Sequence, residues 1–351
     1  MAYNTIISLD AMGGDFGPKV IIPAADQALK HLDNTKFLIY GDEQEINAQL
    51  SRSPELAKHS QVFHTDLKIS STEKPSLALR NSKGSSMRLA IEAVKSGEAQ
   101  AVVSAGNTGA LMALSKLILK CLPGVTRPAL ASLLPTITDK TVMLDLGANL
   151  SCDAEVLTQF AIMGAVYARV VQGISQPKIG LLNVGTEDMK GHEEVRNAAS
   201  ILANIQMPGQ YVGFIEGDDI TKGTVDVVVT DGFTGNVALK TAEGVGKMSK
   251  AFLTEAFKSS PLAILGYLLA RGAINQMKNK VDPKKYNGGM FLGLSGVCVK
   301  SHGGSDVEGT KNAILMAANL VQNNFNARVA SELEELMSQE SFASAISTIG
   351  V

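Results

Sequence analysis

Two side chains able to stabilise negative charge, Lys190 and Asn236, lie just beyond apolar runs that predict buried strands. Gly191 and two acidic residues flank Lys190, so its ammonium can swing onto a phosphate or a developing oxyanion. A lysine that is merely solvated in its loop explains the same pattern equally well. Asn236 can donate from its amide to the same oxygen, or cap a helix that we expect to begin at Val237.

The order of apolar strand, small polar loop and helix recurs five times along the chain. The five loops are centred on Asp10, Gly106, Asp145, Gly185 and Gly232. Parallel strands bring their carboxyl ends to one edge of a sheet, so we expect all five loops to line one crevice. Main-chain N–H groups at helix N-termini favour anions, and we therefore take this crevice as the active site.

Strands that alternate with helices over the whole length predict the elements that hold these loops. We expect an α/β fold, a doubly wound and largely parallel sheet with helices on both faces. Residues 130–134 and 142–146 read as an antiparallel hairpin, which we place at a sheet edge, and one long helical region is expected from Pro75 to Gly97. The prediction is a single catalytic domain over residues 1–351, with a basic helical excursion at about residues 246–285.

Composition narrows the class of protein. With 45% hydrophobic and 19% charged residues the chain can bury a large core and is not disordered. Its three cysteines are odd in number, and neither they nor the five histidines show metal-ligand spacing, so we expect a reducing compartment, no metal and no cofactor. No signal-peptide pattern and no run of about 20 apolar residues occurs, which predicts a cytoplasmic protein that meets a membrane only from its surface.

One segment departs from the weakly acidic balance of the chain. Eight basic and two acidic residues lie between Gly246 and Lys285, a local charge of +6 in a chain of net charge −2. Residues 262–270, inside this segment, are nearly all apolar. This pattern favours an exposed helical projection that meets an anionic surface or an acidic partner. A buried dimer helix and a simple solvated helix face remain open alternatives.

Several common catalytic motifs are missing. No G-x-G-x-x-G follows the first strand, so a nicotinamide-dependent dehydrogenase, our alternative reading, lacks its fingerprint. The stretch from Gly304 to Lys311 approaches a phosphate-loop motif, but its last two residues stand in reversed order. Cys152 has no neighbouring charge or histidine that would activate a thiolate, and no G-x-S-x-G occurs. A substrate must then supply the nucleophile, and inorganic phosphate suits the loops.

Eight motifs, in order along almost the whole chain, resemble those of the bacterial phosphate acyltransferase family of phospholipid synthesis. They are LDAMGGDFGP at 9–18, VSAGNTGALMA at 103–113, RPAL at 127–130, DLGAN at 145–149, LLNVG at 181–185, DGFTGNVALKTAEG at 231–244, YNGG at 286–289 and KSHGG at 300–304. The resemblance implies an architecture like that of phosphate acetyltransferases and isocitrate dehydrogenases. It also implies reversible transfer of a fatty acyl group from acyl carrier protein to inorganic phosphate, in a homodimer without metal or organic cofactor.

The family also implies partners and site residues. Acyl carrier protein and inorganic phosphate are the expected partners, with contact to the membrane surface and to the membrane glycerol-3-phosphate acyltransferase that uses the acyl phosphate, and with no nucleic acid. Lys190 and Asn236 are our catalytic candidates, because they can hold phosphate and stabilise the tetrahedral oxyanion. The motif positions that we assign to substrate binding are Asp10, Gly13, Gly14, Asn107, Thr108, Asp145, Asn149, Asp231 and His302. A non-enzymatic scaffold would explain the basic segment but not five polar loops.

Overall fold

One sheet of 11 strands organises the protein. The computed structural model describes residues 3–280 and 288–339, and the strands within them are ordered β3-β2-β1-β4-β11-β10-β5-β6-β9-β7-β8. In chain order the strands are β1 (Thr5–Asp10), β2 (Thr35–Gly41), β3 (Ser60–His64), β4 (Ala101–Ser104), β5 (Ala129–Pro135), β6 (Lys140–Leu144), β7 (Lys178–Leu182), β8 (Gln210–Ile215), β9 (Val227–Val229), β10 (Gly289–Leu292) and β11 (Val297–Lys300).

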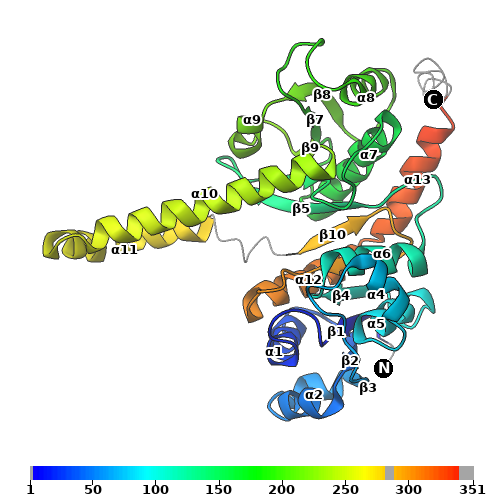
Figure 1. Ribbon diagram of the computed structural model, residues 1–351, viewed down its shortest axis with the longest axis vertical. Helices are drawn as coiled ribbons and strands as arrows, with labels where there is room; N and C mark the ends of the chain where they lie inside the picture. The colour runs from blue at the N-terminus through cyan, green and yellow to red at the C-terminus, as the bar shows by residue number, and fades with distance from the viewer. Residues whose placement is uncertain (1–2, 281–287, 340–351) are drawn as a thin grey trace.

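Helices cover both faces of this sheet (Figure 1). They are α1 (Pro18–Leu29), α2 (Glu43–Leu50), α3 (Pro54–Lys58), α4 (Pro75–Asn81), α5 (Ser86–Lys95), α6 (Thr108–Leu119), α7 (Ala154–Val171), α8 (Glu193–Asn204), α9 (Gly217–Lys222), α10 (Gly232–Lys258), α11 (Pro261–Lys280), α12 (Val307–Gln322) and α13 (Phe325–Met337). The order of strands and helices along the chain is that of an α/β protein, as the sequence predicts.

The core has two sides because successive residues of a strand point to opposite faces of a sheet. In β2, Phe37 and Ile39 join the hydrophobic cluster formed with α1, α7 and α12, whereas Leu38 and Tyr40 join the cluster formed with α5 and α6. β4 and β9 are fully buried. Their sequences are nearly continuous apolar runs, because helices cover both faces of these strands. The prediction of a doubly wound sheet is confirmed.

Most neighbouring strands are parallel, and the exceptions lie in the middle. β5 and β6 form the predicted antiparallel hairpin, with Ser132 opposite Met143. The hairpin is not at a sheet edge, however, because β10 and β11 insert between β4 and β5 and pair with them. β11 runs parallel to β4, but β10, β5 and β6 each run antiparallel to the strand before them in the sheet.

This reversal corrects the expectation of one common edge. The chain direction in β6, β7 and β9 is opposite to that in β1 and β4. The loops at Asp10 and Gly106 therefore leave the sheet at one end of its strands. The loops at Asp145, Gly185 and Gly232 leave it at the opposite end of the strands. The antiparallel β5–β6 hairpin causes the reversal, since β5 runs in the same direction as β4 and β11. The place of this hairpin inside the sheet depends on strands from the end of the chain, which local sequence patterns do not show.

Two helix boundaries also differ from the prediction. The region from Pro75 to Gly97 is not one helix but two, and the hydroxyl of Ser85 caps the second by accepting the N–H of Arg88. α10 begins at Gly232, five residues before Val237, because Asp231 caps it. The short helix α9 has no counterpart in the sequence analysis.

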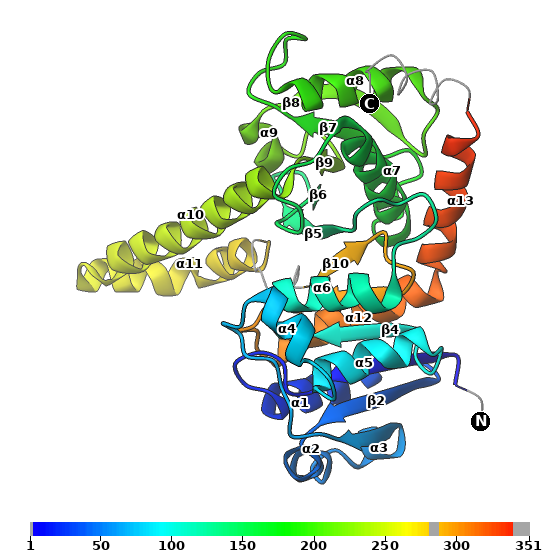
Figure 2. The same cartoon turned by 45° about the vertical axis from the view of Figure 1, so that its right-hand side comes forward.

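α10 and α11 form a long helical hairpin that projects away from the sheet and its covering helices (Figures 1 and 2). Exposed apolar side chains gather on it, among them Leu262 and Leu269, which are 81% and 82% exposed. The hairpin contains most of the basic segment, whose residues 281–285 lie outside the described residues. Among the described residues, one helix, α7, is long and apolar enough to cross a membrane, and 78% of it is buried inside the protein.

Candidate active site

Three loops at the carboxyl ends of β1, β4 and β11 form what we call the first loop group, residues 10–15, 104–107 and 300–304. Its centre is Asp10, which is buried and accepts one hydroxyl on each carboxylate oxygen. Ser86 donates to Oδ1 and Ser104 to Oδ2, both at 2.6 Å. Burial raises the pKa of Asp10, and these two hydrogen bonds and the charge of Lys300 oppose the rise. Asp10 therefore holds these loops together from beneath.

Glycines let the three loops pack closely. A Cβ on Gly13 would lie 2.7 Å from the main-chain nitrogen of Gly106. Gly14 has a φ of +79°, and a Cβ there would lie 2.9 Å from the carbonyl oxygen of Gly303. The N–H of Asp15 donates to that same carbonyl at 2.9 Å. The predicted binding residues Gly13 and Gly14 thus fix the shape of the first loop group.

His302 completes this group at its surface. The side chain is exposed, and Nδ1 accepts the N–H of Gly304 at 3.2 Å. Desolvation, followed by the charges of Lys300 and Lys240, lowers the pKa of His302. The neutral imidazole is therefore favoured near neutral pH.

Asn107 and Thr108 stand at the start of α6. The Oδ1 of Asn107 caps this helix by accepting the N–H of Ala110 at 3.0 Å, and its Nδ2 donates to the carbonyl oxygens of Ser71 and Glu73 at 2.9 Å each. Its amide is thus engaged within the protein. Thr108, beside it, is exposed.

The loops after β6, β7 and β9 form the second loop group, residues 145–149, 183–191 and 230–236. Asp145 is fully buried, and its carboxylate accepts the N–H groups of Leu130, Ala148 and Asn149 at 2.7 to 3.0 Å. The side-chain amide of Asn149 also donates to Oδ2 of Asp145 and to the carbonyl of Pro128. The main-chain carbonyl of Asn149 accepts the N–H of Gly232. Burial raises the pKa of Asp145, and the hydrogen bonds from Leu130 and Ala148 oppose this.

Asp231 rather than Asn236 caps α10. Its two carboxylate oxygens accept the N–H of Thr234 at 2.9 Å and the hydroxyl of Thr234 at 2.7 Å. The cap role considered for Asn236 is therefore wrong. Asn236 is an exposed residue in the second turn of α10, and it lies against Gly147 of the Asp145 loop. Its amide makes no hydrogen bond to the residues that the structure describes.

Gly235 explains how α10 comes so close to the Asp145 loop. A Cβ at Gly235 would overlap the carbonyl oxygen of Asp145, so only glycine lets the first turns of α10 rest on that main chain. This contact sets the position of Asn236 one residue later. The D-G-F-T-G-N stretch in the sequence is thus a helix cap followed by a close-packing residue and an exposed amide.

Lys190 lies in the loop after β7 and is exposed. Main-chain contacts hold the loop: the N–H of Lys190 donates to the carbonyl of Glu187 at 3.0 Å, and the Nδ2 of Asn183 donates to the carbonyl of Lys190 at 3.0 Å. The aliphatic stem of Lys190 packs beside Gly185. Because β7 pairs with β9, this loop and the start of α10 leave the same sheet edge. Lys190 and Asn236 therefore belong to one loop group, as catalysis by both requires.

α10 links the two loop groups, which the sheet topology separates. The helix begins in the second group, at Asp231, and in its third to fifth turns carries Lys240, Glu243 and Lys247. The charges of these three residues act on His302 of the first group. The predicted substrate-binding positions thus lie in two loop groups that α10 connects.

Cys152 lies beside the second loop group and is buried. Burial, followed by the charges of Asp145 and Asp231, raises the pKa of its thiol to about 12. A thiol that stays protonated is a poor nucleophile, so the surroundings do not support an acyl-cysteine intermediate.

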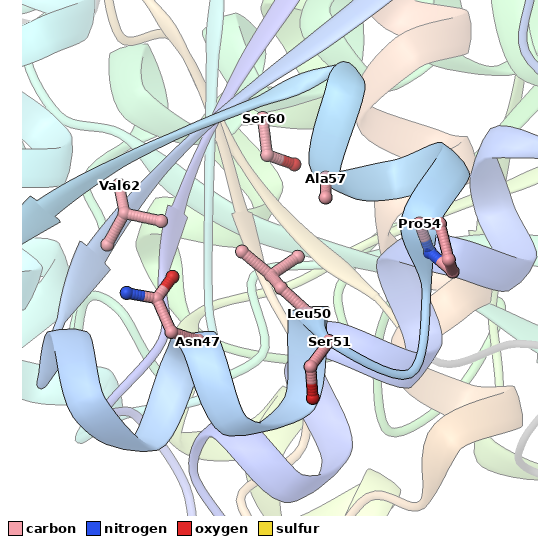
Figure 3. Close-up of a pocket in the computed structure, with 7 residues that line it drawn as sticks. All are labelled: Asn47, Leu50, Ser51, Pro54, Ala57, Ser60 and Val62. Atoms are coloured by element: carbon pink, nitrogen blue, oxygen red, sulfur yellow. The ribbon is translucent and has the colours of Figure 1, made fainter.

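Within residues 3–280 and 288–339, no cluster of three or more histidine, cysteine or acidic side chains could hold a metal ion. A cavity of about 500 Å³ lies between α2, α3 and β3 (Figure 3), away from both loop groups. It is lined by Asn47, Leu50, Ser51, Pro54, Ala57, Ser60 and Val62.

Lys300 is a residue that the sequence reasoning missed. It ends β11, with a side chain buried under the first loop group. The available signal was a lysine that directly follows three strand residues with apolar side chains, since lysine is rarely buried without a specific partner.

The fold is similar to those of solved phosphotransacetylases. It is similar to that of EutD phosphotransacetylase from Staphylococcus aureus, with a TM-score of 0.61 at 15% identity over 91% of this chain and 94% of that one. A phosphotransacetylase from Streptococcus pyogenes gives a TM-score of 0.62 at 18% identity over 91% and 94%. The architecture is thus the phosphotransacetylase-like α/β fold that the sequence predicts.

Sequence comparison identifies the family. The family model described as fatty acid synthesis protein matches residues 5–328. The phosphate acyltransferase of Rhodospirillum centenum is 54% identical over 336 residues, 96% of this chain and 95% of that protein. That of Paramagnetospirillum magneticum is 51% identical over 340 residues, 97% of each. The chain belongs to this fatty acid synthesis protein family, and the dehydrogenase alternative is not favoured.

Proposed function

We propose that the protein reversibly transfers a fatty acyl group from acyl carrier protein to inorganic phosphate and releases acyl phosphate for phospholipid synthesis. The observation that carries the proposal is that Lys190 and Asn236 follow two paired parallel strands, β7 and β9, in a chain that belongs to the family over nearly its whole length. The protonated state of Cys152 supports direct attack by phosphate rather than a covalent acyl-enzyme.

In this reaction a phosphate oxygen attacks the thioester carbonyl and forms a new C–O bond. Lys190 brings a compact positive charge, and Asn236 brings an amide N–H, to the phosphate and to the oxygen that becomes negative. The tetrahedral intermediate collapses with cleavage of the C–S bond, and the carrier thiol leaves as thiolate. A thiolate is a good leaving group, so no strong general acid is required. Holding both reactants in place supplies much of the acceleration.

The direct test uses acyl carrier thioester, with and without inorganic phosphate, and detects acyl phosphate by phosphorus nuclear magnetic resonance. We expect acyl phosphate and free carrier thiol in equal amounts, and only when phosphate is present. Thiol release at the same rate without phosphate would identify a thioesterase and would contradict the proposal.

We further propose that the protein is a cytoplasmic homodimer that associates peripherally with the membrane through the α10–α11 hairpin. Exposed apolar side chains such as Leu262 and Leu269, near the basic residues Lys258 and Arg271, support this surface as a membrane contact. Such a contact would deliver acyl phosphate next to the membrane glycerol-3-phosphate acyltransferase. Acyl carrier protein and the second subunit are the other candidate occupants of the hairpin.

Flotation with anionic phosphatidylglycerol vesicles distinguishes these occupants. The double variant Leu262→Glu, Leu269→Glu should lose vesicle binding at low salt, while Ile137→Glu, which changes a side chain 81% exposed in the β5–β6 connection, should keep it. Sedimentation of the same variants reports the dimer. Unchanged flotation together with a loss of dimer would assign the hairpin to the subunit interface instead.

A further inference from the structure

Lys300 occupies an unusual position for a lysine. It is the last residue of β11 and is only 8% exposed. In the register of the sheet its Cα partner is Ser104 of β4, whose partner on the other side is Asp10 of β1. A basic, a hydroxyl and an acidic side chain thus stand in one row at the carboxyl ends of three adjacent parallel strands.

Within this row the ammonium of Lys300 donates hydrogen bonds to main-chain carbonyls and not to Asp10. Asp10 is occupied by the hydroxyls of Ser104 and Ser86. The Nζ of Lys300 instead donates to the carbonyl oxygen of Ala105 at 3.3 Å, and to the carbonyl oxygen of Ser301. One ammonium therefore holds the loop after β4 to the loop after β11.

This arrangement also directs the peptide groups above it. In a trans peptide the C=O and the N–H point in opposite directions. When the carbonyl of Ser301 points down to Lys300, the N–H of His302 points to the other side of the loop, where the His302 side chain is exposed. The glycine contacts of Gly13, Gly14 and Gly303 then hold the first loop against its neighbours.

A positive charge therefore lies beneath a compact loop group made largely of small residues. Interactions of such a charge are screened less than at the surface, because the surrounding medium is less polarisable than water. Its effect reaches the outer side of the group, since Lys300 lowers the pKa of His302. An oxyanion bound at the outer side of the group would meet the field of this buried cation.

We propose that Lys300 is a positioning residue that makes the first loop group a subsite for a phosphate-type oxyanion. This inference rests on the proposed acyl transfer, in which two such groups take part. One is the inorganic phosphate that accepts the acyl group, and the other is the phosphodiester of the phosphopantetheine arm that carries it. Both present the same chemistry to Lys300.

The charge state of Lys300 gives the proposal a pH signature. Burial lowers the pKa of Lys300 to about 8, and the charge of Asp10 opposes this. Oxyanion affinity should therefore fall as the pH rises through about 8, while inorganic phosphate stays a dianion. The other groups that interact electrostatically with Lys300 are Cys298, Asp15 and His302. Helices α6 and α12, which pack against β11, carry Lys116, Glu308 and Lys311.

The test compares Lys300→Met and Lys300→Arg with wild type in the full-length protein. Lys311→Met is the matched control, because it removes one positive charge from the nearby helix α12 without touching the first loop group. Steady-state kinetics are measured with varied phosphate, and with two donors, acyl-phosphopantetheine and acyl-pantetheine, that differ only in the phosphate of the arm. Near-ultraviolet circular dichroism of each variant checks the fold.

We expect Lys300→Met to raise one KM by about 10-fold or more and kcat to change less, as loss of a binding charge requires. A higher KM for phosphate assigns the subsite to the acceptor. A higher KM for acyl-phosphopantetheine alone, with acyl-pantetheine unaffected, assigns it to the donor arm. Lys300→Arg should keep the affinity and hold it above pH 9, because arginine stays charged.

Two results would overturn the proposal. One is a folded Lys300→Met protein with both KM values unchanged. The other is equal affinity of wild type and folded Lys300→Met for inorganic phosphate and for phosphopantetheine in isothermal titration calorimetry. Calorimetry needs no turnover, so failure of the subsite is distinct from failure of the proposed reaction.

Discussion

Asn149 donates twice to the same oxygen of Asp145, from its main-chain N–H at 2.7 Å and from its side-chain amide at 2.9 Å. The amide has its second donor on the carbonyl of Pro128, at 2.8 Å. Both hydrogens of the Asn149 amide are therefore used inside the protein. We infer that these two residues hold the second loop group in shape and leave substrate contacts to exposed residues of that group.

The first prediction follows from this pair. Asp145→Asn places an NH2 group where N–H donors now find an acceptor, and each unsatisfied buried group costs about 1–3 kcal/mol. The free energy of unfolding in urea should fall by at least that amount. Asp139→Asn, an exposed position in the β5–β6 connection, is the matched control and should leave it unchanged. Equal stability of the two variants would show that the hydrogen bonds of Asp145 do not stabilise the fold.

Asp145 also predicts a pH dependence. Burial raises its pKa in the folded state above the ordinary value of 3.8. Between 3.8 and the raised value the folded protein holds a proton that the unfolded chain has released, so this group's contribution to stability decreases as the pH rises through that window. The slope of unfolding free energy against pH should be more negative in wild type than in Asp145→Asn. An identical slope would contradict the raised pKa.

Lys190 is predicted to act in catalysis and not in folding. Lys190→Ala should keep the melting temperature and lower turnover by about 100-fold, the scale for losing one donor to an oxyanion. Lys190→Arg should recover little, because a planar fork does not replace a compact charge. Lys178→Ala, an exposed lysine at the opposite end of β7, is the matched control. Near-normal turnover with Lys190→Ala would remove this residue from the mechanism.

Asn236 and Asp231 should separate activity from stability. Asp231→Ala removes the cap of α10 and should cost about 1 kcal/mol of stability. Asn236→Ala, inside the helix, should cost little or none, because alanine has the higher helix propensity. Its turnover with acyl carrier thioester should nevertheless fall. If Asn236→Ala lost stability and kept its turnover, the amide would have a structural role instead.

Cys152 is predicted to be dispensable for the chemistry. Its thiol has a pKa raised to about 12, so Cys152→Ala should retain turnover within about 2-fold, and alkylation of the wild-type thiol at neutral pH should be slow. Rapid alkylation that abolishes turnover, together with an inactive but folded Cys152→Ala, would point to an acyl-cysteine.

The sequence predicted the elements well where local chemistry determines them. The antiparallel hairpin of residues 130–134 and 142–146 follows from apolar runs within its own segment. The place of the β5–β6 hairpin inside the sheet could not be predicted in this way, because it depends on which distant strands pair. The one-edge crevice was wrong for that reason.

The site was predictable to a similar extent. Lys190 and Asn236 were placed in loops that do share one sheet edge. Asn149 was assigned to substrate binding, but its amide is consumed by Asp145 and Pro128, which only the folded contacts reveal. The sequence does not predict the burial of Lys300, because a lysine at the end of a strand is usually exposed. Only the packing of the loops above it shows that this side chain is buried.

The central place of β10 and β11 bears on how the chain is made. These strands stand between β4 and β5, although β4 and β5 follow one another in the chain. A nascent polypeptide that stops short of residue 300 holds two partial sheets, each with an open hydrogen-bonding edge where its partner will come. Open edges of this kind recruit strands from other molecules. Synthesis of the last sixth of the protein therefore closes a window for aggregation, and products of early termination have no native sheet to join.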